Sequence, residues 1–294
     1  MLLANPQRRQ GVFLMAQTQV SIFIINLDES TGRFQRVSSR LEKLGLDFER
    51  VPAISSGMLT SVEKRRLNPE RPWILLSDSE LACFASHLKA IQLVADRELE
   101  RAIILEDDAI FDDDFSIWAA NEFPLPDDLD IIKLEGFGAE GTIKIPILVY
   151  LDKIVQFSYK PTWGAAAYLI TLAGARKALK ELKIVRGQLD YDLFAYWKTG
   201  LRVYEANPFP ARQDGSSSTI HHKHVRQPVL HRVLRYFIRR FDRIRRLIFV
   251  IRRFGIHALG GSAVTRVFAQ PIHYASTAGR ARASSDPPVP SPEG

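Results

Sequence analysis

One stretch of the sequence decides the fold: residues 101–109, which read RAIILEDDA. Its residues 102–105 form an unbroken apolar run, which is typical of a buried strand. Three acids, Glu106, Asp107 and Asp108, follow directly, so the strand ends in carboxylates. Open α/β sheets bind their ligands beyond the carboxyl ends of their strands, and we therefore expect a binding site at this point.

The sequence around this strand alternates between strand and helix patterns. On the amino-terminal side we expect strands at 20–27 and 46–51 and helices at 32–44 and 77–94. On the carboxyl-terminal side we expect strands at 130–134, 149–157, 165–170 and 202–206 and helices at 172–182 and 190–198. The alternation predicts one α/β domain over residues 18–225, with a mixed, mainly parallel sheet flanked by helices.

Charge is unevenly distributed along the 294 residues, whose net charge is +7 from 40 Lys and Arg and 33 Asp and Glu. Residues 221–254 hold ten arginines, Lys223 and a single acid, Asp242, which gives this segment a charge of +10 and the remainder −3. A basic segment joined to a slightly acidic body indicates two functions, one of them binding to phosphate or anionic lipid.

Residues 226–274 are expected to form a basic amphipathic helical segment. Apolar residues recur there at helical spacing, and arginines occupy mostly the other side. The wide apolar face favours binding to an anionic membrane surface through residues 229–254. Two alternatives use the same residues: binding to nucleic-acid phosphates, and packing of the apolar face on the body or on a second subunit. Residues 275–294 lack apolar periodicity and are expected to be disordered.

The amino terminus and the cysteine content bear on the compartment. Residues 10–27 carry no charge, but four polar side chains interrupt them, so we expect neither a signal peptide nor a transmembrane helix there. Residues 1–17 are expected to be an extension of the domain. The single cysteine, Cys83, forms no intramolecular disulfide, which makes a reducing cytoplasm the expected compartment.

The acids after the central strand have the chemistry of a divalent-metal site. Side chains two residues apart in a strand share a face, which predicts that Glu106 and Asp108 point together. Such hard oxygen ligands suit Mg²⁺ or Mn²⁺, each commonly held by one or two carboxylates and the phosphates of a bound nucleotide. The alternative is that the acids cap the next helix or lie in solvent.

Six segments resemble, in this order, the pattern of glycosyltransferase family 25, which includes bacterial lipooligosaccharide galactosyltransferases and collagen galactosyltransferases. They are INLD at 25–28 with Arg33 and Arg36 after it, SELACFASHLK at 79–89, ILEDDA at 104–109, YLI at 168–170 with Gly174 and Ala175 after it, LD at 189–190, and STI at 218–220. The resemblance covers about residues 20–220.

The resemblance implies a GT-A-like inverting transferase that moves a hexose from a UDP-sugar to a lipooligosaccharide or lipopolysaccharide acceptor. Galactose is the hexose that the resemblance favours. It also implies Mn²⁺ or Mg²⁺ at an Asp-any-Asp motif, which Glu106-Asp107-Asp108 resembles. Because its first residue is Glu, Asp108 is expected to be a direct metal ligand ahead of Glu106, with Asp107 also at the donor. A lipid-linked acceptor implies a cytoplasmic protein, peripheral at the inner face of the cytoplasmic membrane, with no nucleic acid as partner.

An inverting displacement needs a carboxylate that takes the proton of the acceptor hydroxyl. Asp190 is the first candidate and Asp192 the second, because residues 187–190 open a predicted helix after a glycine. The alternative is that Asp190 is only the N-cap of that helix.

Five more residues are expected to contact the donor. Asn26 and Asp28 follow the first strand, at the place where the base and ribose of a bound nucleotide are expected to lie. Arg33 can approach its phosphates. Glu80 and His87 lie on one helical face and are expected to line the cleft. The alternatives are turn and cap roles for Asn26 and Asp28, and a hydrogen-bonded core position for His87.

Other interpretations of the sequence stay open. His221, His222 and His224 are a weak candidate for a zinc site, or for a further ligand of a diphosphate-bound metal. Trp163 suits either stacking on a sugar or core packing, and residues 213–219 are expected to form a loop that closes over the donor. Two alternative functions are a non-enzymatic basic protein that binds membranes or nucleic acid, and a metal-dependent phosphohydrolase.

Overall fold

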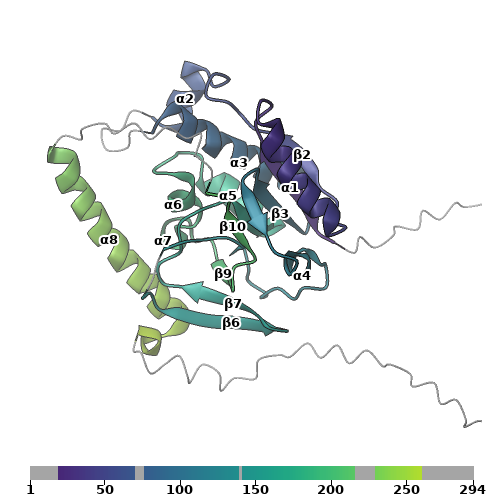
Figure 1. The fold of residues 1–294 in the computed structure, drawn as a ribbon. Coiled ribbons are helices and arrows are strands. Elements are labelled where there is room, and N and C mark those ends of the chain that lie inside the picture. Colours follow the sequence, from purple (N-terminus) through teal and green to yellow (C-terminus); the bar gives the residue numbers. More distant parts are fainter. Residues whose placement is uncertain (1–18, 70–75, 139–140, 216–228, 260–294) are drawn as a thin grey trace, which may run out of the picture.

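The structure is a computed structural model that describes residues 19–69, 76–138, 141–215 and 229–259 (Figure 1). These residues form an eight-stranded sheet with helices packed on it, a two-stranded sheet beside one of its edges, and a long helix along the side of the body. The predicted mixed sheet flanked by helices is confirmed. The histidines at 221, 222 and 224, the STI segment and both termini lie outside the described residues.

The large sheet has the strand order β2-β1-β3-β8-β5-β9-β7-β6. Only three of its seven pairings are parallel, namely β1 with β2, β1 with β3, and β5 with β9, so the expectation of a mainly parallel sheet is wrong. The strands are β1 Ser21–Asn26, β2 Glu49–Pro52, β3 Arg101–Glu106, β5 Ile131–Lys133, β6 Lys144–Tyr150, β7 Lys153–Ser158, β8 Ala167–Thr171 and β9 Val203–Asn207.

A hairpin accounts for part of that difference. Residues 149–157 were expected to be a single strand, but the chain turns at Leu151 and Asp152 and returns as an antiparallel partner. Leu151 is 65% exposed and has a positive φ of 54°. Its apolar side chain continues the strand pattern across a tight turn, which is why the pattern alone did not reveal the reversal.

The helices predicted at 32–44, 77–94 and 172–182 are present, α8 lies within the segment predicted at 226–274, and the short helices α2 and α4 were not predicted. The expected helix at 190–198 is two short helices, because the backbone leaves the helical conformation around Phe194 and Ala195. The helices are α1 Thr31–Lys43, α2 Ser61–Leu67, α3 Asp78–Asp96, α4 Phe115–Ala119, α5 Leu172–Glu181, α6 Leu189–Leu193, α7 Tyr196–Thr199 and α8 Val229–Phe254, followed by the 3₁₀ turn η1 Ile256–Leu259.

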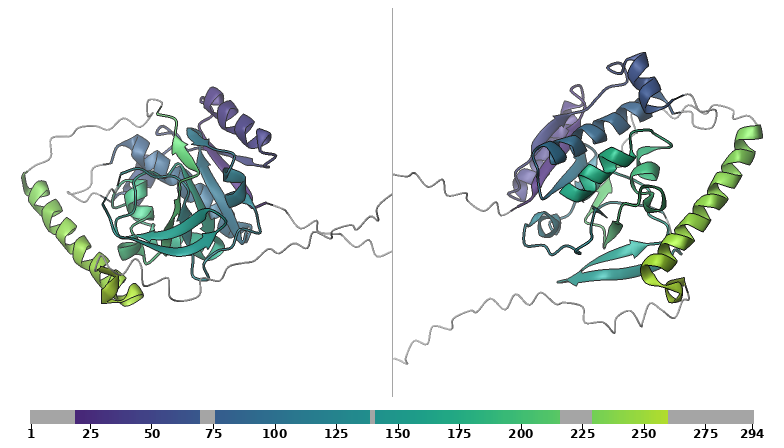
Figure 2. Two further views of the ribbon diagram at one scale, coloured as in Figure 1. Left: turned by 60° about the horizontal axis from the view of Figure 1, so that its bottom comes forward. Right: turned by 180° about the vertical axis from the view of Figure 1, so that it is seen from behind.

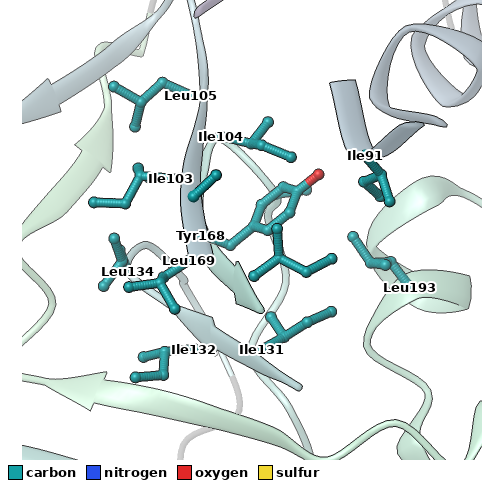
Figure 3. Close-up of a cluster of buried hydrophobic side chains, with 14 of the residues drawn as sticks. Ile91, Ile103, Ile104, Leu105, Ile131, Ile132, Leu134, Tyr168, Leu169 and Leu193 are labelled. Carbon is teal, nitrogen blue, oxygen red and sulfur yellow. The ribbon is translucent and has the colours of Figure 1, made fainter. Parts of the chain in front are cut away.

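Strand β3 occupies the middle of the core. Its residues 102–105 are fully buried, and Figure 3 shows Ile103, Ile104 and Leu105 among side chains of β5, β8, α3 and α6. β3 runs parallel to β1, with Ile25 opposite Glu106, so the polar residues that follow both strands emerge at the same edge of the sheet.

Helix α3 begins with a capping box, in which Ser77 accepts from the backbone N–H of Glu80 and Glu80 accepts from that of Ser77. Nine of its nineteen residues are buried, among them Phe84, His87 and Ile91. Burial of this face fixes His87 beneath the end of β3.

A second, two-stranded sheet joins β4 Ala109–Phe111 to β10 Ala211–Gln213. Neither strand was expected from the sequence, since each has only three residues. The antiparallel pairing places Gln213 opposite Ala109, and the backbone N–H of Asp214 donates to the carbonyl of Asp108 at 3.0 Å. The acid-rich turn after β3 is thereby brought against the end of the domain.

Helix α8 packs on the body through its carboxyl-terminal half, beside α7 and β7 (Figures 1 and 2). Phe254 meets the ring of Phe157 at 4.8 Å between centroids, Phe249 meets Tyr196 at 4.7 Å, and Val250 is buried. None of the helices in the described part of the chain is long and apolar enough to span a bilayer.

Candidate active site

The site begins where β1 and β3 end, at Asn26 and Glu106. Asn26 is buried, and its amide donates to Asp107 Oδ2 at 2.8 Å and to the carbonyl of Ser30 at 3.0 Å. Arg33 Nη1 lies 3.3 Å from the other oxygen of Asp107. Both oxygens of Asp107 therefore have protein partners, although burial still raises the pKa of this carboxyl above its ordinary value.

Glu106 is oriented by a buried chain of two hydrogen bonds through His87 to Tyr168, called here the His87–Tyr168 relay. His87 Nε2 lies 3.0 Å from Glu106 Oε1, and His87 Nδ1 lies 3.0 Å from the hydroxyl of Tyr168. A ring that donates from Nε2 to the carboxylate of Glu106 accepts at Nδ1 from the hydroxyl of Tyr168. His87 is 1% exposed, which matches the alternative of a hydrogen-bonded core histidine, whereas the side chain of Glu106 is 24% exposed.

Asp108 lies in the turn after β3 and not in the strand itself. The strand rule that predicted a shared face for Glu106 and Asp108 therefore does not apply. The two carboxylates are nevertheless neighbours, since Glu106 contributes to the shifted pKa of Asp108. Burial first, and then the charges of Glu106, Asp107 and Asp214, raise the pKa of Asp108 to about 7.

One atom of this cluster lacks a partner: Asp108 Oδ1 is buried and accepts no hydrogen bond from any described residue. A buried carboxylate oxygen without a partner is costly, and so is a group of like charges at one place. A divalent cation would offset both costs, and carboxylate oxygens are its preferred ligands. The residues present thus fit Mg²⁺ or Mn²⁺, with Asp108 and Glu106 as the side chains that would hold it.

Cys83 lies beside the same carboxylate. Its Sγ, a ring nitrogen of His87 and an oxygen of Glu106 all lie within 4.8 Å of one another. Burial and the nearby acids raise the pKa of the Cys83 thiol well above its ordinary value. The thiol therefore stays protonated, which makes it a poor ligand compared with the carboxylates.

The first candidate base, Asp190, lies in the first turn of α6, whose N-cap is Gln188. The alternative of an N-cap role for Asp190 is therefore wrong. Its Oδ2 accepts from the backbone N–H of Gly164 at 3.1 Å, and its Oδ1 accepts from that of Tyr191 at 2.8 Å. Two backbone donors from different elements hold this carboxylate in one orientation.

Gly164 is required by a residue that the sequence analysis did not select, Glu135. Gly164 has a φ of +92°, and a Cβ at this position would lie 2.4 Å from Glu135 Oε2. Glu135 also accepts from the backbone N–H of Ala166 at 3.2 Å. The pKa of Glu135 is raised to about 7. Burial is the largest cause, the charges of Glu106 and Asp190 act in the same direction, and the charge of Lys133 opposes them. Glu135 therefore lies close enough to Glu106 and to Asp190 for both charges to act on it.

Lys133 fixes the loop above Glu135. Its ammonium donates to the carbonyls of Thr162 at 2.6 Å and Gly164 at 2.8 Å. Burial lowers its pKa to about 8, against the opposing effect of Glu205, Glu135 and Asp190. The loop that carries the Gly164 N–H to Asp190 is thus anchored from the core.

Asp192 has a different environment from Asp190. It is 3% exposed, and its Oδ2 accepts from the backbone N–H groups of Arg186 at 2.5 Å and Gly187 at 2.9 Å. These bonds close the turn that precedes α6. Asp192 therefore holds the backbone around Asp190, and we favour Asp190 as the base.

The other predicted donor contacts lie around the edge of the site. Asp28 is exposed and pairs with Arg50 at 2.5 Å. Glu80 Oε1 accepts from Gln188 Nε2 at 2.9 Å, which ties the start of α3 to the start of α6. Trp163 is 48% exposed, so the core interpretation is wrong for this residue.

A pocket opens next to Asp190. The loop at 160–163 forms one wall, α6 and α7 contribute a second, and Arg246 of α8 contributes a third. The aromatic side chains Trp163, Phe194 and Trp197 line it together with Tyr191.

Two site residues were missed for different reasons. Glu135 follows the predicted strand 130–134 directly, so the strand-end rule that selected Glu106 would have found it as well. Asp214 carried no such signal, because only the pairing of β4 with β10 brings it to Asp108.

Comparison with known proteins gives a family and several relatives. The profile described as "Glycosyltransferase family 25 (LPS biosynthesis protein)" matches residues 19–195. The "Lacto-N-neotetraose biosynthesis glycosyltransferase LgtE" of Neisseria meningitidis is 25% identical over 208 residues, which are 65% of this chain and 73% of that protein. The human "Procollagen galactosyltransferase 2" is 30% identical over 174 residues, which are 53% of this chain and 26% of that protein.

One solved structure with a similar fold is that of the galactosyltransferase LgtC in complex with donor and acceptor sugar analogues. It is 12% identical, with a TM-score of 0.36, over 74% of this chain and 94% of that chain.

Proposed function

The chain belongs to glycosyltransferase family 25, and on this premise we propose that it transfers galactose from a UDP-sugar to a lipooligosaccharide or lipopolysaccharide acceptor. The transfer inverts the anomeric carbon and uses a divalent cation in this proposal. The place of the chain among glycosyltransferases of the lipopolysaccharide-biosynthesis type rests on the family match. The donor, the sugar, the metal and the stereochemistry are our proposal.

The single observation that carries the proposal is the buried, unpartnered Oδ1 of Asp108 among three further carboxylates, at the carboxyl end of the central strand. When bound there, a divalent cation supplies charge neutralisation for the departing nucleoside diphosphate. Glu106 is kept in orientation by the His87–Tyr168 relay, and Asp107 by Asn26 and Arg33. Arg33, whose side chain is 18% exposed, also offers positive charge to a diphosphate.

Asp190 takes the proton of the acceptor hydroxyl in this proposal. Its two backbone hydrogen bonds hold the carboxylate, and the pocket beside it gives an acceptor access. A direct displacement with this base on the acceptor side inverts the anomeric carbon.

A panel of nucleotides tests the function. We expect UDP, UDP-galactose and UDP-glucose to raise the melting temperature of the protein in the presence of Mn²⁺ and to do so much less with chelator, because a ligand of the native state stabilises it by mass action. Transfer to a truncated lipooligosaccharide then identifies the hexose. If none of these compounds shifts the melting temperature with Mn²⁺, the proposal is wrong, and release of free sugar or phosphate in the presence of acceptor would favour a phosphohydrolase.

We also propose that α8 attaches the protein to the inner face of the cytoplasmic membrane. One face of α8 is committed to the body: Asp242 is buried and accepts from Tyr191 at 2.5 Å, and Arg253 donates to the hydroxyl of Tyr204 at 3.1 Å. At 3.6 residues per turn, the roughly opposite face carries exposed apolar residues. These are Phe237, Phe241, Ile244, Ile248 and Ile251, with exposures from 37% to 64%.

Arginines flank this exposed apolar ridge on both sides. Arg240 and Arg243 lie on one side of it, and Arg245 and Arg252 lie on the other, and all four are exposed. An apolar ridge between two basic borders matches a bilayer interface with anionic headgroups. The face of α8 that holds Asp242 packs on the body, as the packing alternative expects, and the exposed apolar face supports our proposal of membrane binding.

Substituting the ridge tests this attachment. We expect Phe241→Asp combined with Ile244→Asp to weaken binding to anionic vesicles by at least about tenfold in a sedimentation assay, because two buried apolar side chains are lost from the interface. A double variant of Met58→Asp and Leu151→Asp, both exposed apolar residues away from α8, is the matched control. Equal binding of both variants, or equal binding of the wild type to neutral and anionic vesicles, would contradict the proposal.

A further inference from the structure

The pocket beside Asp190 is built from three separate parts of the chain. Lys160 and Trp163 come from the loop after β7, Trp197 comes from α7, and Arg246 comes from α8. Asp242, one turn before Arg246, is buried between Tyr191 and Lys198, with its Oδ2 3.3 Å from the Lys198 ammonium. This contact locks α8 against the pocket, so Arg246 has a fixed place in its wall.

Two hydrogen-bond donors in this wall are unused. Arg246 Nε and Trp197 Nε1 are both buried, and neither has a partner among the described residues. The Arg246 guanidinium stacks on the Trp197 ring, with its central carbon 4.0 Å from the ring centroid, so the two donors belong to one stacked pair. Neither group can accept a hydrogen bond, and no acceptor among the described residues satisfies either, so both donors suit the acceptor atoms of a ligand.

The charge of this wall indicates which acceptor. Asp242 is engaged with Tyr191 and Lys198, and within the described parts of the chain no carboxylate lies at ion-pair distance from Arg246. Lys160 adds a second cation to the lining, while Asp190 is its single acid. A guanidinium with spare donors and a nearby ammonium favours the paired oxygens of a phosphate or a carboxylate over a neutral hydroxyl.

The same pocket has a surface for a sugar ring. Trp163 is 48% exposed, and Phe194 lies on the lining as well. Flat aromatic faces pack against the C–H faces of sugars. Asp190 lies on the same lining, so a saccharide bound in the pocket would lie beside this carboxylate.

We infer that this pocket binds an acceptor saccharide that carries an acidic group, a phosphate or a carboxylate, next to the hydroxyl that is glycosylated. Arg246 and Trp197 bind the acidic oxygens, and Trp163 packs on the ring. The inference rests on the proposed function for the role of Asp190, and it specifies the substrate class that the comparisons leave open.

Titration of tryptophan fluorescence tests it, since Trp163 and Trp197 both line the pocket. The probes are glucose 6-phosphate, glucuronate, glucose and glycerol 1-phosphate, each without donor or metal. We expect at least one of the two acidic sugars to bind about tenfold or more tightly than glucose and than glycerol 1-phosphate. Comparison of the two acidic sugars then tells phosphate from carboxylate.

Two variants locate the binding. Arg246→Gln and Trp197→Phe should each reduce the affinity for the acidic sugar to near that for glucose, and Trp197→Phe keeps the ring while removing its N–H. Arg65→Gln removes the same charge from an exposed position of α2 and should leave the affinity unchanged.

Three results would overturn the inference: no preference for an acidic sugar over glucose, equal binding of glycerol 1-phosphate, or equal affinity losses in Arg246→Gln and Arg65→Gln. None of these measurements involves donor or metal. Failure of the proposed function would instead appear as the absence of a Mn²⁺-dependent shift with UDP, which leaves the result for this pocket standing.

Discussion

Replacing Asp108 with asparagine is expected to lower sugar transfer by at least about a thousandfold, with Mn²⁺ and donor both saturating for the wild type. The reason is that Asp108 Oδ1 is the buried carboxylate oxygen that no described residue satisfies. An amide keeps the shape but removes the negative charge. The measurement is the initial rate of transfer from radiolabelled UDP-sugar, together with the Mn²⁺-dependent rise in melting temperature, which should also disappear.

Asp113→Asn is the matched control, because Asp113 is an exposed acid a few residues further along the chain. It should retain the transfer rate of the wild type. Undiminished transfer by Asp108→Asn under metal-free conditions would contradict the role of this residue as a metal ligand.

A measurement of stability tells loss of chemistry from loss of fold in the Asp108→Asn variant. Without metal, the folded state holds the pKa of Asp108 at about 7, well above the ordinary value of an aspartate. A raised carboxyl pKa means that the stability contributed by the protonated group at low pH is lost as the pH rises from about 4 to about 7. Asp108→Asn removes this loss, so at pH 8 it should melt at or above the temperature of the metal-free wild type.

Replacing Asp190 with asparagine is expected to lower the turnover number by about 10²–10⁴-fold while leaving donor binding intact. Asparagine can still accept from the N–H of Gly164, so the loop keeps its position, but an amide does not take a proton. Rates at saturating donor, and the Mn²⁺-dependent melting shift with UDP, separate the two effects. The shift should remain, unlike in Asp108→Asn.

Asp192→Asn is the matched comparison two residues away. Its oxygen can still accept from Arg186 and Gly187, so we expect a lower melting temperature but a turnover number within a few-fold of the wild type. The reverse result, with transfer lost in Asp192→Asn and kept in Asp190→Asn, would assign the base to Asp192.

The order of the elements could be predicted from sequence to a large extent because their patterns are local. The run at 102–105 is buried as β3, the helical spacing of 77–94 is α3, and the arginine-rich repeat is α8. The prediction failed where two patterns look alike. An apolar residue in a turn, Leu151, concealed the β6–β7 hairpin, and the three-residue strands β4 and β10 are too short to show a period.

The acidic site was predictable in position and not in detail. Glu106, Asp107 and Asp108 were selected together, yet each has a different environment. Asp107 is bound by Asn26 and Arg33, Glu106 is held by His87, and Asp108 is left with a free oxygen. These differences depend on side chains from β1, α1 and α3, up to 81 residues away in sequence.

The sequence by itself determined that a hydrophobic strand ends in carboxylates within an α/β domain, and that a basic amphipathic helix follows, since both are properties of consecutive residues. Only the tertiary structure decided which carboxylate keeps an unsatisfied oxygen, that Asp214 joins the group, and which face of α8 is exposed. The physical reason is that burial and hydrogen-bond satisfaction depend on neighbours contributed by distant segments, and no local pattern records them.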